Sequence, residues 1–150
     1  MTYSLNHIVN SIAAMLKEHW PEYTVYDART QQGTKYPCFY IQLMPSQIND
    51  EIDGREMRNI SLDVIFLQQR NLPDASQKLL DVADGLDELL DYISYTDGDH
   101  APVLLHTHDR NYSIEDQELH YKITLRNRVA RDEIRIKINE VEEMNVEVEE

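Results

Sequence analysis

The sequence predicts an α+β domain with two helices packed on one face of a mainly antiparallel sheet of four to five strands. Two segments carry apolar residues at three- and four-residue spacing, the period of a helix. Several others alternate apolar and polar residues, the period of a strand. The predicted order is α-β-β-β-α-β-β with a C-terminal extension, and two helices on one sheet face give these elements a common core.

The first helix is predicted over residues 5–20. Its apolar stripe consists of Leu5, Ile8, Val9, Ile12, Ala13, Leu16 and Trp20. Ser4 is the expected N-cap, because a serine oxygen accepts a free backbone N–H at the start of a helix. Pro21 ends the helix. A short strand is then predicted at residues 23–27.

Two longer strands follow a polar loop at residues 29–35. One is predicted at residues 39–44 and the other at residues 60–67, because both alternate in polarity. The segment between them, residues 46–58, is polar and contains Asp53-Gly54, a turn signal. Strands joined in this way most simply pair antiparallel.

The second helix is predicted from a cap at Asp74 or Ser76 to Ile93, with a wide apolar face and aspartates opposite it. Gly85 lies inside it and costs up to about 1 kcal/mol relative to alanine, so close packing at this position is a possible reason for it. Further strands are predicted at residues 103–107 and 119–126, with a loop at 109–113 between them.

Length and charge limit the function. A chain of 150 residues fits one domain, here residues 1–130, and the net charge of -14 repels nucleic acid phosphates and anionic membranes. Solubility alone is the simpler explanation of that charge. The single cysteine, Cys38, excludes an intrachain disulfide and a cysteine-rich zinc site, and its apolar neighbours predict that it is buried. Without a signal peptide or a long apolar run, we expect a cytoplasmic protein or one assembled there.

No chemical site is predicted. His106 and His108 lie two apart and would share one strand face, with Asp109 and His100 nearby, but the sequence names no further ligands. The acidic residues Asp50, Glu51, Asp53 and Glu56 crowd one loop, a poor support for a catalytic pair. Nucleophile-elbow and phosphate-loop patterns are missing. We therefore predict no enzyme, cofactor or metal; a metal-dependent hydrolase using the two histidines is one alternative.

Two segments favour contacts with partners. Tyr23, Tyr26, Tyr36 and Tyr40 surround the first loop, and tyrosines suit either interfaces or half-buried strands. That loop is the main basic and amide-rich segment of an acidic chain. Its candidate contact residues, with a neighbouring subunit or a tube, are Arg29, Gln31, Gln32, Lys35 and Tyr36.

Residues 131–150 form a separate acidic arm or tail. Ile134, Ile136 and Ile138 alternate with Arg135 and Lys137, a strand signal. After Asn139 the ionisable side chains are all glutamates. Either this segment is a frayed terminus, or its isoleucines form an arm that adds an edge strand to a neighbour.

Three segments together resemble the bacteriophage tail terminator, or tail completion, family. They are the Trp-Pro-x-Tyr-x-Val-Tyr stretch at residues 20–26, the Gln-x-Gly…Pro-Cys-Phe-x-Ile-x-Leu stretch at residues 31–43, and the strand-helix pair at residues 59–93 with its two-strand return. The resemblance covers about residues 5–130 and not the end after Asn139.

This resemblance implies a ring, usually a homohexamer, in the virion tail and assembled in the host bacterial cytoplasm. The ring would cap the tail tube, stop its polymerisation and meet the head-tail connector, while DNA passes through without specific binding. Asp50, Glu51, Asp53 and Glu56 are then candidates for the lumen, and the 29–35 loop and Ile134–Ile138 for contacts between neighbours. The alternative is an acidic DNA mimic that inhibits a DNA-binding partner.

Overall fold

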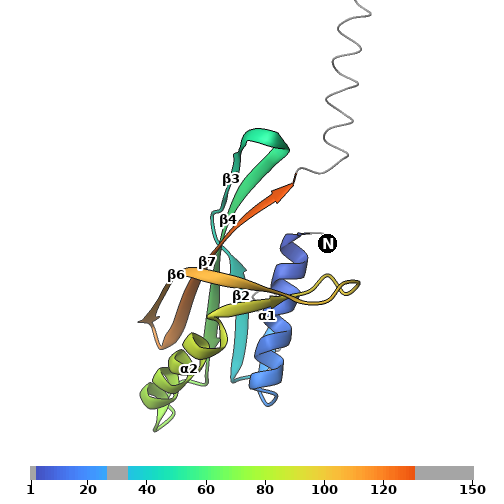
Figure 1. Ribbon diagram of the computed structural model, residues 1–150. Coiled ribbons are helices and arrows are strands. Elements are labelled where there is room, and N and C mark those ends of the chain that lie inside the picture. The colour runs from blue at the N-terminus through green and yellow to red at the C-terminus, as the bar shows by residue number, and fades with distance from the viewer. Residues whose placement is uncertain (1–2, 27–33, 131–150) are drawn as a thin grey trace, which may run out of the picture.

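Two helices and seven strands make up residues 3–26 and 34–130, the part of the chain that the computed structural model describes (Figure 1). The elements are α1 (Leu5–His19), β1 (Thr24–Tyr26), β2 (Cys38–Leu43), β3 (Gln47–Asp50), the 3-10 turn η1 (Ile52–Gly54), β4 (Arg55–Leu67), α2 (Ala75–Leu89), β5 (Tyr92–Tyr95), β6 (Val103–Glu115) and β7 (Glu118–Ala130). The α+β class is confirmed. The predicted count of four to five strands was too low.

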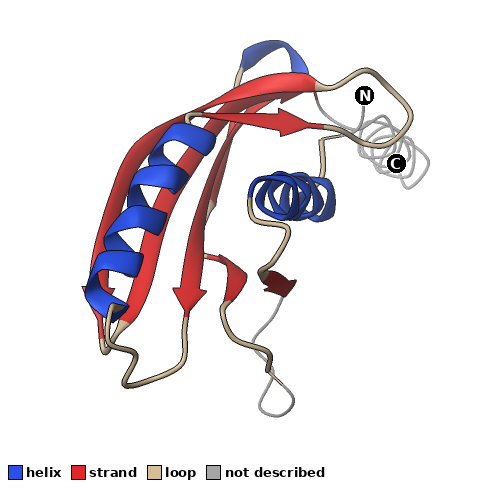
Figure 2. Cartoon of the chain, turned by 90° about the horizontal axis from the view of Figure 1, so that it is seen from below, coloured by secondary structure: helices blue, strands red, loops and turns tan. Residues whose placement is uncertain are grey.

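The strands form one curled sheet in the order β1-β2-β4-β7-β6-β5, with β3 beside the first part of β4. Only β1 and β2 are parallel; the other described pairs are antiparallel, as predicted for β2 and β4. The longest ladder joins β4 to β7. Figure 2 shows the sheet curving around α1, which is seen end-on there.

Both helices pack into one apolar cluster against the sheet. α1 contributes Ile8, Ile12 and Leu16, and α2 contributes Leu79, Val82, Ala83 and Leu86. The sheet contributes alternate residues of its central strands: Phe39 and Ile41, then Ile60, Leu62, Val64 and Phe66, then Leu119, Tyr121, Ile123 and Leu125. Because successive side chains of a strand point to opposite faces, these residues share the face that the helices cover.

Three strand segments lie where the sequence predicted a loop or a helix, and two predicted strands are longer than expected, since β4 begins at Arg55 and β7 ends at Ala130. β3 lies in the segment expected to be a loop, β5 takes Ile93 out of the predicted helix, and β6 continues through residues 109–113. In each case a neighbouring strand supplies the backbone partners: β4 for β3, β6 for β5, and β7 for β6. Pairing with a neighbour therefore overrides a polar or ambiguous local composition.

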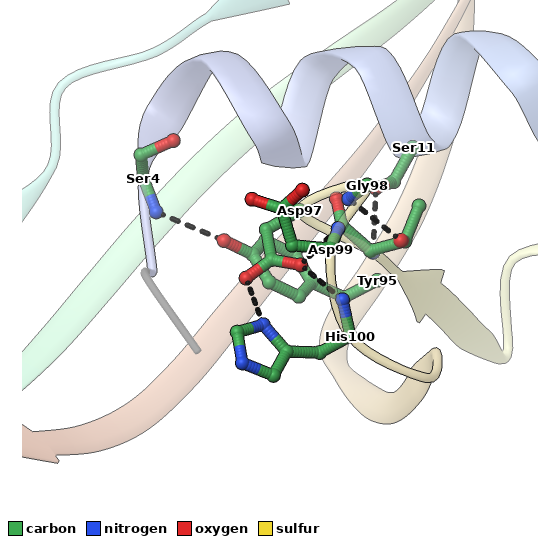
Figure 3. A network of polar contacts seen from close by, with 8 residues as sticks. Ser4, Ser11, Tyr95, Asp97, Gly98, Asp99 and His100 are labelled. Carbon is green, nitrogen blue, oxygen red and sulfur yellow. Dashed lines mark hydrogen bonds and ion pairs between the residues drawn. The ribbon is translucent and has the colours of Figure 1, made fainter.

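A network of polar contacts fixes α1 to the loop between β5 and β6 (Figure 3). Ser4 is confirmed as the N-cap, since its Oγ accepts the N–H of His7 at 3.2 Å, and its own N–H donates to the Tyr95 hydroxyl. Ser11 Oγ accepts the N–H of Thr96 at 3.1 Å and donates to the Thr96 carbonyl at 3.4 Å. These bonds hold β5 against the helix although β5 is short.

Replacing Ser11 by alanine is expected to lower the free energy of unfolding by about 1 to 2 kcal/mol. The Ser11 side chain is buried, so the Thr96 N–H that it accepts would be left without a hydrogen-bond partner. Urea unfolding followed by circular dichroism measures the loss. Asn10→Ala is the matched control, since Asn10 is exposed on the same helix. Equal stability of the two variants would contradict the role given to Ser11.

Candidate interaction surfaces

The predicted acidic loop is the tip of a projecting β-hairpin. β3 pairs with the first part of β4, and the last residues of β7 pair with β4 on its other side. Figure 1 shows these three segments extending beyond the two helices. Asp53 and Gly54 make the turn, each with a φ of 68°. We call residues 47–59 and 126–130 the β arm.

The four carboxylates predicted to face a lumen do not share one environment. Glu51 is paired with Arg128, whose Nε and Nη2 lie 2.6 and 3.2 Å from its two oxygens. Asp53 is exposed at the turn. Asp50 lies opposite Glu56, which is only 7% exposed because it is on the face of β4 that continues the core side. The sequence-based set was therefore wrong to treat Glu56 as an exposed loop residue.

The Glu51–Arg128 pair makes the stability of the protein depend on pH. The hydrogen bond and positive charge of Arg128 lower the pKa of Glu51 below its ordinary value of 4.5. A lowered folded-state pKa adds stability above about pH 4.5 that is lost as the pH falls through the folded pKa. We expect Glu51→Gln to lose less stability than the unaltered chain on acidification across this range. Because the ion pair is near the surface, the expected difference in melting temperature between the two chains is small. Parallel plots of melting temperature against pH would contradict the expectation.

The candidate loop residues are divided by the structure. Lys35 and Tyr36 are described and exposed, Tyr36 to 48%, and Tyr36 borders a shallow hollow with Leu67 and Arg70. Arg29, Gln31, Gln32, Ile134, Ile136 and Ile138 lie outside the described residues.

The tyrosines near that loop have three different positions. Tyr23 packs in the core, with its ring centroid 5.4 Å from that of Phe66. Tyr26 and Tyr40 stack at 5.3 Å on the face of the sheet opposite the helices. Of the four, Tyr36 alone is exposed, so it is the one suited to an interface.

His106 and His108 share a strand face as predicted, with ring centroids 5.0 Å apart. His106 also meets the edge of the Tyr92 ring at 4.9 Å. The two other residues considered with them are engaged elsewhere: His100 with Asp97, and Asp109 with Arg126. In residues 3–26 and 34–130 no group of three or more His, Cys, Asp or Glu is placed to hold a metal ion. Cys38 is buried, as predicted.

The sequence did not point to a row of charges on the helix-free face of the sheet. His120 Nδ1 lies 2.8 Å from an Asp63 oxygen, and its Nε2 lies 3.3 Å from Glu118. Asp63 is 4% exposed and comes from β4, whereas His120 and Glu118 come from β7. Residues 57 positions apart meet here through the β4–β7 register, which local spacing does not reveal.

Sequence reasoning also missed two exposed apolar residues in the second half of β6. Tyr112 is 60% exposed and Ile114 is 44% exposed. The available signal was the alternation of these two residues with Asn111, Ser113 and Glu115, which is a strand pattern hidden in a polar stretch.

Comparison with known protein families gives a match over most of the chain. A family model described as phage tail terminator protein matches residues 7–137, which includes all the strands and nearly all of α1. No curated protein matches the chain. Among the described residues, no helix has the length and apolar character needed to cross a membrane. The chain therefore belongs to the phage tail terminator family, whose members are structural proteins of the phage tail.

Proposed function

We propose that this protein caps the phage tail tube as a ring, stops tube polymerisation and forms the tail side of the head-tail joint. The family match over residues 7–137 is the observation that carries the proposal. Its partners are then other copies of itself, most simply five more in a homohexamer, together with the tail tube protein and the head-tail connector.

The proposed ring gives the surfaces described above distinct roles. Three carboxylates of the β arm, the exposed Asp50 and Asp53 and the partly exposed Glu51, face the lumen, where negative charge repels passing DNA. The loop with Arg29, Gln31, Gln32, Lys35 and Tyr36 contacts a neighbour or the tube. The ring is assembled in the host cytoplasm and ends in the virion tail.

Light scattering behind size-exclusion chromatography tests ring formation. A homohexamer of 17.7 kDa chains has a mass of about 106 kDa, and a closed head-to-tail ring gives one discrete species across protein and salt concentration. A ladder of masses that grows with concentration would instead indicate open assembly.

A phage that lacks this protein tests the capping role separately. We expect tail tubes of uncontrolled length and heads without attached tails in electron micrographs, and recovery of normal particles when the purified protein is added. Tails of normal length joined to heads would overturn the proposal.

A further inference from the structure

We propose that residues 134–138 of one copy add as an extra strand to the free edge of β6, at residues 111–115, in the next copy. The inference rests on the proposed ring, and it names the surface through which neighbouring subunits meet.

The acceptor is a strand edge without a partner in the described part of the chain. β5 pairs with β6 only over residues 103–106, whereas β7 pairs with β6 as far as Glu115. Asp116 and Gln117 form a two-residue turn with φ values of 49° and 65°, so Glu115 and Glu118 close the hairpin as a hydrogen-bonded pair. Hydrogen-bonded and non-hydrogen-bonded pairs alternate along an antiparallel ladder, so Tyr112 and Ile114 are in non-hydrogen-bonded pairs with β7. Their backbone N–H and C=O groups therefore point away from β7. Such an edge accepts another strand.

Two apolar side chains on this edge lie at the border of the hydrophobic core. Tyr112 and Ile114 lie opposite Tyr121 and Leu119, which belong to the core, so they are on the helix-covered face. They are nevertheless 60% and 44% exposed, and Leu80 on α2 is 51% exposed. A groove between α2 and β6 lies beside Tyr112, and its lining includes the polar side chains of Asp87 and Arg110. A further strand with apolar residues on one face would extend the core over Tyr112 and Ile114.

Residues 134–138 have the matching pattern. They read Ile-Arg-Ile-Lys-Ile, so in a strand the three isoleucines share one face and the two basic side chains share the other. Isoleucines on the helix side would cover Tyr112 and Ile114. The segment has no acidic residue, whereas the acceptor edge ends in Glu115 and Asp116. The charges of the two segments are therefore complementary.

The segment cannot reach the edge of its own chain. Ile114 is paired with Leu119, and Leu119 is eleven residues before Ala130 along β7, about 36 Å at the rise of a strand. Ile136 is six residues after Ala130, and six residues span at most about 22 Å. Figure 1 shows the end of β7 far from the end of β6. Each copy therefore donates at one end and accepts at the other, which is the head-to-tail type of contact that a ring of identical subunits requires.

Cross-linking between two full-length variants tests the contact. Tyr112→Cys and Ile136→Cys are mixed and treated with a short bismaleimide, and linked peptides are identified by mass spectrometry. Cys38 is buried in the folded chain and does not interfere. Asp81→Cys replaces Tyr112→Cys in the control, because Asp81 is exposed on α2. We expect the 112–136 link at least about tenfold above the control, since a bound segment has a millimolar effective concentration at its site.

A 112–136 link at the control level would overturn the strand addition, whether or not a ring forms. Light scattering on the unaltered chain reports the ring independently, so a ring without the link rejects this contact and leaves the proposed function standing.

Variants of the two segments give a second measurement. Ile114→Pro removes an outward N–H without breaking a bond to β7, and Ile136→Asp places a charge among the isoleucines. Both are expected to weaken association tenfold or more with unchanged circular dichroism of the monomer. Val148→Asp is the matched control, because it places the same charge outside residues 134–138. Unchanged association of Ile136→Asp would contradict the proposal.

Discussion

Replacing Phe66 by alanine is expected to lower the free energy of unfolding by about 3 to 5 kcal/mol. Phe66 is fully buried near the end of β4. Its ring centroid lies 5.1 Å from that of Phe39 and 5.4 Å from that of Tyr23, so it joins β2 and the segment after α1 to the centre of the sheet. Alanine removes apolar surface that folding buries and leaves a cavity that the two neighbouring rings cannot readily fill.

Urea unfolding at equilibrium measures this loss. Ile52→Ala is the control, because Ile52 is 86% exposed at the tip of the β arm and its truncation costs less than about 0.5 kcal/mol. Phe66→Leu is expected to fall between the two, since most of the volume is kept. A loss below about 1 kcal/mol for Phe66→Ala would show that this region is not packed as described.

Helix propensity predicts that Gly85→Ala stabilises the fold, whereas we expect this substitution to destabilise it. Gly85 is inside α2, where alanine is favoured over glycine by about 1 kcal/mol. A Cβ at this position would lie only 2.6 Å from an atom of the Trp20 ring. That ring is held by its neighbours, with centroids 5.2 Å from Phe39 and 4.3 Å from His19. We therefore expect Gly85→Ala to destabilise the fold by about 1 to 3 kcal/mol through overpacking.

A double-mutant cycle separates packing from propensity. Trp20→Phe removes the ring atoms nearest to Gly85, so Gly85→Ala should be neutral or stabilising in that background. Asp84→Ala is the matched control, because Asp84 is the exposed neighbour in the same turn and alanine there has no ring to meet. If Gly85→Ala stabilises the chain that keeps Trp20, the close packing of α2 on Trp20 is wrong.

Much of the fold follows from local pattern. The caps and apolar stripe of α1, the antiparallel pairing of β2 with β4, and β7 all match the sequence prediction, because each element carries its own period and its own stop signal. β3 and the second half of β6 do not follow from it. Their residues are polar or mixed, and they are strands because each pairs across a short turn with the strand that follows it, β3 with β4 and β6 with β7.

The candidate surfaces follow the same division. That Asp50, Glu51 and Asp53 lie near a turn was predictable from composition and the Asp53-Gly54 pair. The burial of Glu56 and the pairing of Glu51 with Arg128 depend on the register of β3, β4 and β7. The exposed pair Tyr112 and Ile114 was missed for a related reason: β5 stops short of them, and nothing in their own segment says so.

The sequence by itself therefore determined the class of fold, the two helices, the main strands and the resemblance to a family, because these depend on the order of apolar and polar residues along the chain. Only the tertiary structure decided which charges are paired, why Gly85 is a glycine, and which strand edge is left without a partner. Those properties depend on how segments far apart in the chain align, and a ladder of cross-strand hydrogen bonds sets that alignment for whole strands at once.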